Sequence, residues 1–153
     1  MIVVLDNVRS MHNVGSLFRT CDAFMVESIC LCGITATPPH REIEKTALGA
    51  TKSVDWRYYT DSLDAIKFLK KNGYTVCAVE QFYKSVLIQD FNVLCDIRYA
   101  LVFGNEVTGI NQNLLEVVDY IIEIPHIGTK KSFNVSVAAG IALWNFFIKA
   151  QSG

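Results

Sequence analysis

Hydrophobic residues along this chain form short β-branched runs that alternate with stretches of helical spacing. The run IVVLD at 2–6 predicts a buried strand, and SICLCGI at 28–34 predicts a second one. Between these strands the apolar residues recur every three or four positions, as on one face of a helix: Val14, Leu17, Phe18, Cys21, Phe24 and Met25. A turn-rich stretch containing Pro38 and Pro39 follows the second strand.

The same alternation continues through the rest of the chain. Further strands are predicted at 54–58, 74–79, 98–103 and 119–124, and further helices at about 61–71, 111–118 and 134–149. Strands interleaved with helices favour a mostly parallel sheet covered by helices on both faces. No linker, repeat or low-complexity segment interrupts the pattern. We therefore expect residues 1–153 to form a single α/β domain with no appended module.

Composition is typical of a compact globular domain, since 51% of the 153 residues are apolar and 19% are charged. The five cysteines are odd in number and include no C-x-x-C pair, which favours reduced thiols and a cytoplasmic location. Asp6 interrupts the first apolar run too early for a signal peptide, and no run approaches the roughly 20 apolar residues of a membrane span. The sequence therefore predicts a soluble cytoplasmic protein.

A formal net charge of −1 gives the chain no strong overall attraction to phosphate backbones, so any nucleic acid must be bound by local charges. The candidate cations are Arg9, Arg19, His40, Arg41, Lys45, Lys52, Lys130 and Lys131. The alternative is that each of these groups is ordinary solvated surface.

The segment that begins the first helix carries three residues suited to a binding site. Asn13 stands where an N-cap residue belongs, and Gly15 removes a side chain from the first turn. Arg19 lies off the apolar stripe, so packing of that face does not require it and it is available to a ligand. A capped surface helix with a solvated arginine is the alternative interpretation.

The second candidate stretch is YALVFGNEVTGI at 99–110, where an apolar strand ends in Gly104 and Glu106 follows. Ligands of parallel α/β sheets bind beyond the carboxyl ends of strands. A glycine there lets the backbone approach a ligand closely, and Glu106 places a carboxylate beside it. The dinucleotide fingerprint G-x-G-x-x-G is absent. A tight turn into the next helix is the alternative.

The third stretch is IPHIGTKKSFNVSVAAGIALWNFF at 124–147, in which a polar segment leads into an apolar helix. It is not a nucleotide-hydrolase phosphate loop, because Gly128 is not followed directly by Lys-Ser or Lys-Thr. Ser132 can cap the helix, and Asn134 adds donor and acceptor groups. Only two side chains in 135–148 are polar, so this helix is buried nearly all round or packs its outer face on a partner.

Together the three stretches resemble the three motifs of the SpoU/TrmH group of RNA ribose 2′-O-methyltransferases in the SPOUT superfamily. The matching segments are N-x-G-x-x-x-R at 13–19, F-G-N-E-x-x-G-I at 103–110 and I-P…S-F-N-V-S-V-A at 124–138. PPHREIEKTALGA at 38–50 is similar to the family's loop after its second strand. The resemblance covers nearly the whole chain, and three motifs in order are more specific than any one alone.

The resemblance implies transfer of a methyl group from S-adenosylmethionine to a ribose 2′-hydroxyl of tRNA or rRNA. It also implies the SPOUT fold, whose C-terminal part forms a deep trefoil knot, whereas periodicity alone predicts a Rossmann-like arrangement. In the family the knotted region forms a homodimer interface, which would account for the apolar helix at 134–149. We expect neither a membrane nor a metal, since the histidines have no ligand spacing, and no appended RNA-binding domain.

The resemblance assigns residues of this chain to three groups. The catalytic positions are matched by Asn13, Arg19, Glu106, Ser132 and Asn134. The cofactor would be held, mostly by backbone, at Gly104, Ile124 and Phe133, with Pro125, Val135 and Ala138 closing the pocket. Candidate contacts to substrate RNA are Arg9, Arg41, Lys45, Lys130 and Lys131. Many relatives have glycine where this chain has Val107, which leaves the conformation of that loop open.

An arginine side chain stays protonated at neutral pH, so Arg19 is not a plausible proton acceptor. We interpret it as a charged group that stabilises the developing alkoxide and binds the adjoining phosphate, with Glu106 and Asn13 orienting it. The family's arrangement implies that Arg19 of one subunit faces the cofactor of the other. Two alternatives stay open: a catalytically silent RNA-binding or assembly factor with the same fold, and an ordinary nucleotide-binding α/β enzyme.

Overall fold

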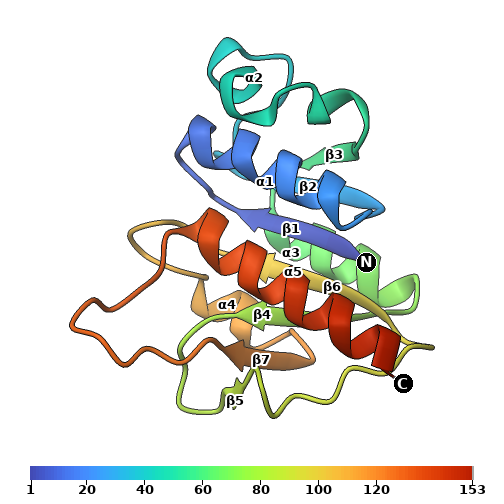
Figure 1. The fold of residues 1–153 in the computed structure, drawn as a ribbon, viewed down its shortest axis with the longest axis vertical. Coiled ribbons are helices and arrows are strands. Elements are labelled where there is room, and N and C mark those ends of the chain that lie inside the picture. Colours follow the sequence, from blue (N-terminus) through green and yellow to red (C-terminus); the bar gives the residue numbers. More distant parts are fainter. Residues whose placement is uncertain (153) are drawn as a thin grey trace.

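The computed structural model describes residues 1–152, which form one seven-stranded sheet with helices on both faces (Figure 1). Strand order is β3-β2-β1-β6-β4-β7-β5, and every neighbouring pair is parallel. The strands are β1 (Ile2–Asp6), β2 (Ser28–Cys32), β3 (Asp55–Tyr59), β4 (Tyr74–Val79), β5 (Val86–Leu87), β6 (Arg98–Phe103) and β7 (Tyr120–Glu123). The helices are α1 (Met11–Ala23), α2 (Arg41–Ala47), α3 (Ser62–Lys71), α4 (Gln112–Leu115) and α5 (Val135–Ser152), with a 3-10 turn η1 (Ala50–Lys52).

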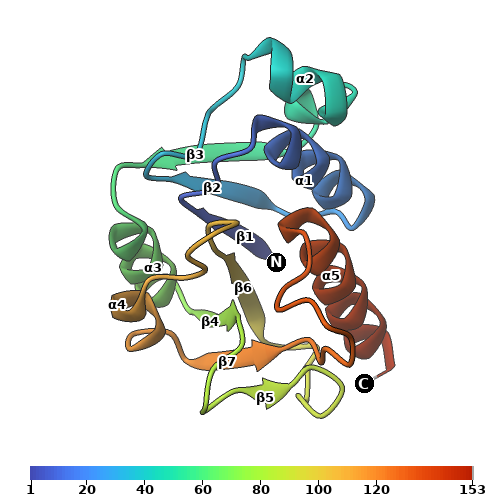
Figure 2. The same cartoon turned by 90° about the vertical axis from the view of Figure 1, so that its left-hand side faces the viewer.

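Two helical layers enclose the sheet, with α1 and α5 on one face and α3 and α4 on the other (Figure 2). Successive side chains of a strand point to opposite faces, so a central strand must be apolar at every position. In β1, Val3 and Leu5 pack in the core under α1 and α5, whereas Ile2 and Val4 pack in the core under α3. The continuous apolar runs of the sequence are thus explained by burial on both sides.

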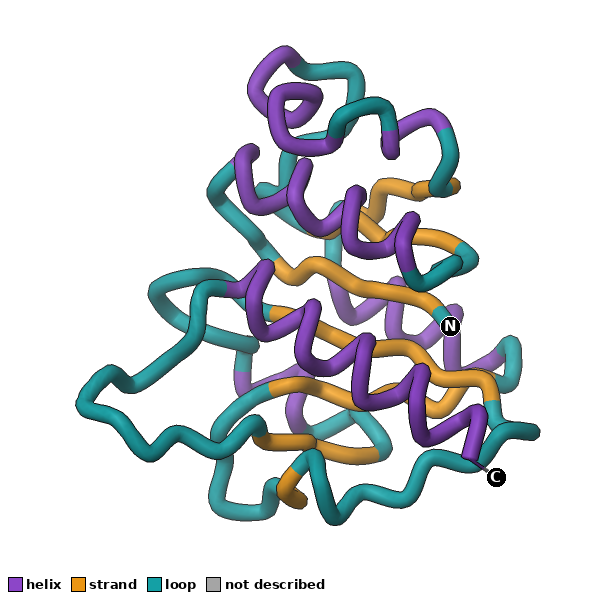
Figure 3. Tube along the Cα trace, viewed as in Figure 1, coloured by secondary structure: helices purple, strands orange, loops and turns teal. Residues whose placement is uncertain are grey.

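The hydrophobic pattern located most of these elements. The predicted strands at 2–6, 74–79 and 98–103 coincide with β1, β4 and β6, and the helix predicted at 61–71 is α3. The mostly parallel sheet with helices on both faces is confirmed. Figure 3 shows that the longest loops precede β6 and α5, where the sequence has no clear period.

Short elements escaped the sequence analysis. Helix α2 and the turn η1 lie in the stretch predicted only as turn-rich, and β5 has two residues. Helix α4 has four residues instead of the eight predicted at 111–118. Met25 was placed on the apolar stripe of α1, but the helix ends at Ala23 and Met25 is 89% exposed with a φ of +51°. A period needs several turns to be recognised, and these segments are too short.

Both helix caps predicted from the sequence were wrong by two or three residues. Helix α1 is capped by Ser10, whose Oγ accepts the backbone N–H of Asn13 at 3.2 Å. The start of α5 is capped by Asn134, whose Oδ1 accepts the N–H of Ser136 at 3.0 Å, and not by Ser132. Several residues that favour capping occur close together at each start, and local sequence does not rank them.

One side of α5 is apolar and exposed. Its side chains Val137, Trp144 and Phe147 are 50%, 54% and 38% exposed, and Phe24 at the end of α1 packs beside them. The Phe24 ring lies 6.3 Å from Trp144 and 5.8 Å from Phe147, measured between ring centres. We call these four residues the α5 outer face. Nearly complete burial, one of the two alternatives for this helix, therefore does not hold within one chain.

No helix within residues 1–152 combines the length and the apolar character needed to cross a lipid bilayer.

Candidate functional site

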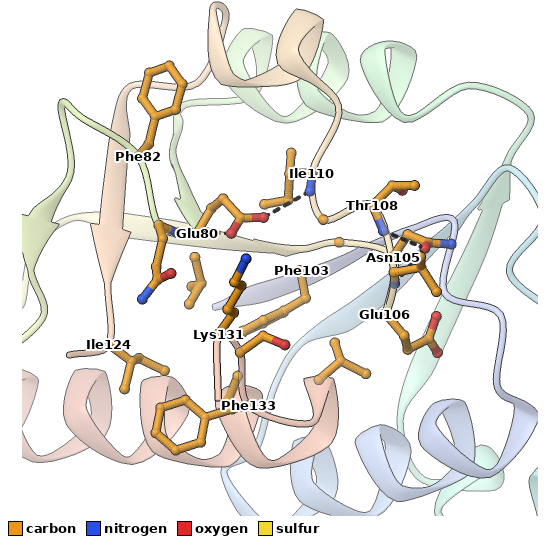
Figure 4. Close-up of a pocket in the computed structure, with 18 of the residues that line it drawn as sticks. Glu80, Phe82, Phe103, Asn105, Glu106, Thr108, Ile110, Ile124, Lys131 and Phe133 are labelled. Carbon is orange, nitrogen blue, oxygen red and sulfur yellow. Dashed lines mark hydrogen bonds between the residues drawn. The ribbon is translucent and has the colours of Figure 1, made fainter. Parts of the chain in front are cut away.

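A cavity of about 690 Å³ lies at the carboxyl ends of β4, β6 and β7 (Figure 4). Its walls come from the end of β4 and the residues after it (79–82), the end of β6 and the turn after it (103–110), the residues after β7, and the segment 131–135 at which α5 begins. This size is within the range of roughly 300–1,000 Å³ that small-molecule sites have. The second and third motif segments thus face each other across one cavity.

Glu106 joins the three motif segments through hydrogen bonds. Its Oε2 accepts the backbone N–H of Arg9 at 2.9 Å, and its Oε1 accepts the backbone N–H of Ser10 at 3.0 Å. The same Oε1 accepts from Nδ2 of Asn13 at 3.2 Å, and Oδ1 of Asn13 accepts from Nδ2 of Asn134 at 3.2 Å. The first helix is therefore fastened to the cavity at the point where Glu106 and Asn134 line it.

The environment of Glu106 favours its ionised form. Partial burial works to raise the pKa of Glu106, but the N–H groups of Arg9 and Ser10 and the Asn13 amide act against it, and the net pKa is lowered. The carboxylate is therefore charged at neutral pH and is already engaged as an acceptor. These bonds suit Glu106 to positioning α1 better than to removing a proton.

The turn at 104–110 is tight, and glycine is required at two of its positions. A side chain at Gly104 would place its Cβ only 2.5 Å from backbone atoms of Gly109 and Ile110, and Gly109 itself has a φ of +69°. Asn105 pairs with Gly109 through two backbone hydrogen bonds. Val107 is not among the residues with positive φ and is 75% exposed, so the turn accommodates valine at this position. The tight-turn alternative is thus correct, and the turn also forms a cavity wall.

The structure brings most of the predicted site residues to this cavity. Those that line it are Gly104, Glu106, Ile124, Ser132, Phe133, Asn134, Val135 and Ala138, together with Lys131. Asn13 is joined to it through Glu106 and Asn134. The residues outside its lining are Arg9, Arg19, Pro125, Arg41, Lys45 and Lys130. Lys131, a candidate RNA contact in the sequence, has its ammonium directed into the cavity (Figure 4).

Arg19 does not reach the cavity of its own chain. It is exposed on α1, six residues beyond Asn13, which corresponds to about 9 Å along a helix axis. Within residues 1–152 it forms no ion pair. Its guanidinium is therefore available to a group outside this chain.

Sequence analysis did not single out Glu80, Gln81 or His126, which also line the cavity. Glu80 accepts the backbone N–H groups of Gln81 at 2.9 Å and Ile110 at 3.0 Å. His126 accepts at Nδ1 from Nε2 of Gln81 at 2.9 Å, and its ring lies 4.2 Å from that of Phe133. Glu80 and Gln81 follow β4, and His126 follows β7. Ligands of parallel sheets bind beyond the carboxyl ends of strands, so these positions could have been proposed from the sequence. The loop at 80–85 contains no glycine to mark it, unlike the turn at 104–110.

His126, one of the residues that line the cavity, has a buried ring nitrogen without a hydrogen-bond partner in the described part of the chain. Because Gln81 Nε2 can only donate, Nδ1 of His126 accepts and Nε2 carries the proton. That Nε2 is buried and has no hydrogen-bond partner within residues 1–152. A buried donor without an acceptor is costly. The Phe133–His126 ring pair at the cavity suits a ligand with a flat heteroaromatic ring, such as a nucleoside.

Fold and site together define a parallel α/β protein with a nucleoside-sized cavity at the carboxyl edge of its sheet. The model of the SpoU rRNA Methylase family matches residues 1–144. The chain therefore belongs to the SpoU rRNA methylase family, which confirms the resemblance of its three motifs.

Individual relatives agree with this assignment. The chain is 34% identical to a tRNA (guanosine(18)-2′-O)-methyltransferase of Thermus thermophilus, over 94% of this chain and 72% of that protein. The structure of the A. aeolicus TrmH/SpoU tRNA modifying enzyme superposes with a TM-score of 0.87 at 28% identity, over 99% of this chain and 75% of the other. An AdoMet-bound rRNA methyltransferase from Sinorhizobium meliloti superposes with a TM-score of 0.87 at 27% identity, and the chain spans 54% of its length.

Proposed function

We propose that this chain transfers the methyl group of S-adenosylmethionine to a ribose 2′-hydroxyl of tRNA or rRNA. The observation that carries the proposal is the convergence of all three motif segments on one cavity, through the hydrogen bonds of Glu106, Asn13 and Asn134. The tRNA methyltransferase of Thermus thermophilus and the AdoMet-bound Sinorhizobium enzyme support both the reaction and the cofactor.

The cavity residues fit this cofactor, whose sulfonium supplies an electrophilic methyl group when bound. Gly104, Ile124 and Phe133 would hold it, and the Phe133–His126 ring pair would pack against its adenine. The protein's own part is then mainly to align the ribose oxygen. Positioning of this kind contributes roughly 7–11 kcal/mol in favourable cases. Ser132 and Asn134 would hold the ribose or a relaying water.

A ligand panel and a transfer assay test the proposal. S-adenosylhomocysteine raises the melting temperature, because a ligand at about 100 times its Kd adds roughly 2.7 kcal/mol of stability, whereas NAD and ATP leave the melting temperature unchanged. Incubation with tritiated cofactor labels total cellular RNA, and the label maps to 2′-O-methyl groups. Stabilisation without labelling would favour the silent RNA-binding factor, and stabilisation by NAD or ATP alone would favour a nucleotide-binding enzyme.

Arg19 is the charged group of the proposed mechanism, stabilising the developing alkoxide and binding the neighbouring phosphate. Since it lies outside the cavity of its own chain, we assign it to the cavity of a second subunit. Substrate RNA would then contact the charged side chains around the two cavities, including Arg9, Arg41, Lys45 and Lys130.

A homodimer requires an interface, and the α5 outer face supplies one. Scattered exposed apolar residues are ordinary, but the rings of Trp144, Phe147 and Phe24 pack against one another, and Val137 is exposed on the same helix. Contiguous apolar patches of this kind mark sites of association. We therefore propose that two copies of the chain pack through α5.

Trp144→Asp converts the dimer to a monomer, because it places an unpaired charge in the centre of the interface. Sedimentation velocity measures the change as a halving of the molecular mass. Phe68→Asp is the matched control, since it puts the same charge on an exposed aromatic of α3, on the opposite face of the sheet. A dimer in the Trp144 variant, or a monomeric wild type, would show that this face has another role.

Three further assignments belong to the same proposal. Residues 1–153 form a single catalytic domain, which the continuous sheet supports. The C-terminal part of the chain forms the deep trefoil knot of the SPOUT fold, which the similarity to the TrmH/SpoU structure supports. The cytoplasm is the proposed compartment, and its support is that all five cysteines are free thiols, four of them buried.

A further inference from the structure

Glu80 belongs to none of the three motifs, yet its side chain points into the cavity (Figure 4). It directly follows β4. Its Oε1 accepts the backbone N–H of Gln81 at 2.9 Å, and its Oε2 accepts that of Ile110 at 3.0 Å. A carboxylate has about four lone-pair sites for hydrogen bonds. Both carboxylate oxygens of Glu80 are therefore held in place and can each accept a further hydrogen bond from a ligand.

The charge of Glu80 is not neutralised by a neighbour. Within residues 1–152, no cation lies within ion-pair distance of it. Lys131 stands on the wall that leads into α5, and Figure 4 shows its ammonium directed toward the Glu80 carboxylate. A group bound between them meets an acceptor on one side and a donor on the other. Hydroxyl groups, which both donate and accept, match this pair.

The position of Glu80 relative to the reacting end identifies which part of the cofactor it faces. Glu106 marks the reacting end, where Asn13 and Asn134 also lie. Glu80 binds the last residue, Ile110, of the same 104–110 turn. A ligand with its sulfonium near Glu106 therefore brings the neighbouring part of the molecule to Glu80. In S-adenosylmethionine the ribose is joined to the sulfur through one carbon.

We propose, building on the proposed function, that Glu80 accepts hydrogen bonds from the 2′- and 3′-hydroxyls of the cofactor's ribose, and that Lys131 donates to one of these oxygens. The methionine ammonium is the competing donor, but Lys131 repels a second ammonium in the same gap. The adenine amino group is the other competitor. Its flat ring suits the Phe133–His126 ring pair instead. Glu80 also disfavours ligands with a phosphate at this position.

Isothermal titration calorimetry of the full chain with four ligands tests the inference. The ligands are S-adenosylhomocysteine, its 2′-deoxy and 3′-deoxy analogues, and 5′-methylthioadenosine, which lacks the amino-acid part. In wild type, each missing hydroxyl weakens binding about 10-fold or more, as expected for a hydrogen bond to a charged acceptor. Glu80→Gln weakens the binding of S-adenosylhomocysteine about 10- to 100-fold. In this variant, removing a hydroxyl from the ligand weakens binding by less than about threefold further. The affinity for 5′-methylthioadenosine falls by the same factor in Glu80→Gln, because this ligand keeps the ribose.

If Glu80 binds the ribose, its substitution removes the dependence of affinity on the two hydroxyls, whereas a purely structural role of Glu80 leaves that dependence unchanged. A variant that merely disturbs the 104–110 turn weakens every ligand by the same factor and keeps the hydroxyl dependence, which would overturn the inference. Glu116→Gln removes a carboxylate outside the cavity lining and binds like wild type. Glu80→Ala is a second variant, with the same expected loss of hydroxyl dependence, should the glutamine variant not fold.

Other outcomes show whether the role of Glu80 or the proposed function is wrong. Equal affinity of wild type for S-adenosylhomocysteine and its deoxy analogues overturns the role of Glu80 and leaves the cofactor assignment intact. A loss in Glu80→Gln that disappears with methylthioadenosine shows that Glu80 binds the ammonium, and the inference is wrong. If S-adenosylhomocysteine does not bind wild type, the proposed function itself fails and the inference with it.

Discussion

Arg19→Ala lowers methyl transfer about 1,000-fold and leaves the Kd for S-adenosylhomocysteine within about twofold of wild type. The expected loss is large because the guanidinium would stabilise charge that exists only in the transition state. Cofactor affinity is spared because Arg19 is assigned to the ribose oxygen and phosphate of the substrate RNA and not to the cofactor. Arg19→Lys keeps the charge but not the bidentate geometry, so we expect it to lose about 100-fold. Single-turnover rates and calorimetry measure the two quantities.

Mixed dimers show whether Arg19 acts across the subunit interface. Ala138→Trp fills the cavity of one chain, and Arg19→Ala disables the arginine of the other. If the arginine serves its partner's cavity, each heterodimer contains one complete site, and mixing two inactive variants restores activity. Lys67→Ala, which removes a cation from α3 on the opposite sheet face, is the control and retains full transfer. No restored activity would place Arg19 in its own chain's site, and near-normal turnover of Arg19→Lys would exclude the bidentate role.

Glu106→Gln lowers methyl transfer about 100-fold and also destabilises the fold by about 1–3 kcal/mol. Glutamine keeps one acceptor oxygen but turns an amino group toward N–H donors, which include the backbone of Arg9 and Ser10. The start of α1 would then be released from the 104–110 turn, and Asn13 would be displaced with it. Urea unfolding and transfer rates measure the two effects, and Glu116→Gln should change neither.

The stabilisation by Glu106 depends on pH in a defined direction. Its pKa is lowered in the folded protein, so its contribution is fully present above the unfolded pKa, which is about 4.3 for glutamate. The contribution is lost as the pH falls from there through the folded pKa. The difference in unfolding free energy between wild type and Glu106→Gln is therefore largest near pH 7 and shrinks below about pH 4. A difference that grows on acidification would contradict the hydrogen-bonding scheme.

The sequence predicted the sheet better than it predicted the connections. Apolar runs such as 2–6 and 98–103 are long enough to show a pattern, and burial on both faces explains why they are continuous. The pattern did not contain α2, β5 or the true caps of α1 and α5. These features extend over a few residues and depend on which of several similar polar groups wins a local contact.

The sequence likewise predicted part of the candidate site, and the tertiary structure decided the rest. Three motifs in the sequence indicated the family by resemblance, and with it the class of ligand and nine of the 22 residues that line the cavity. Gly104 and Glu106 carry such a signal in the sequence because their residue types reflect local backbone geometry and charge. Tertiary structure alone decided that Glu106 binds the N–H of Arg9, 97 residues away, since this requires β1 and β6 to be neighbours. It also decided that Glu80 enters the cavity and that Arg19 stays outside it. Such contacts depend on strand order, which no local pattern along the chain encodes.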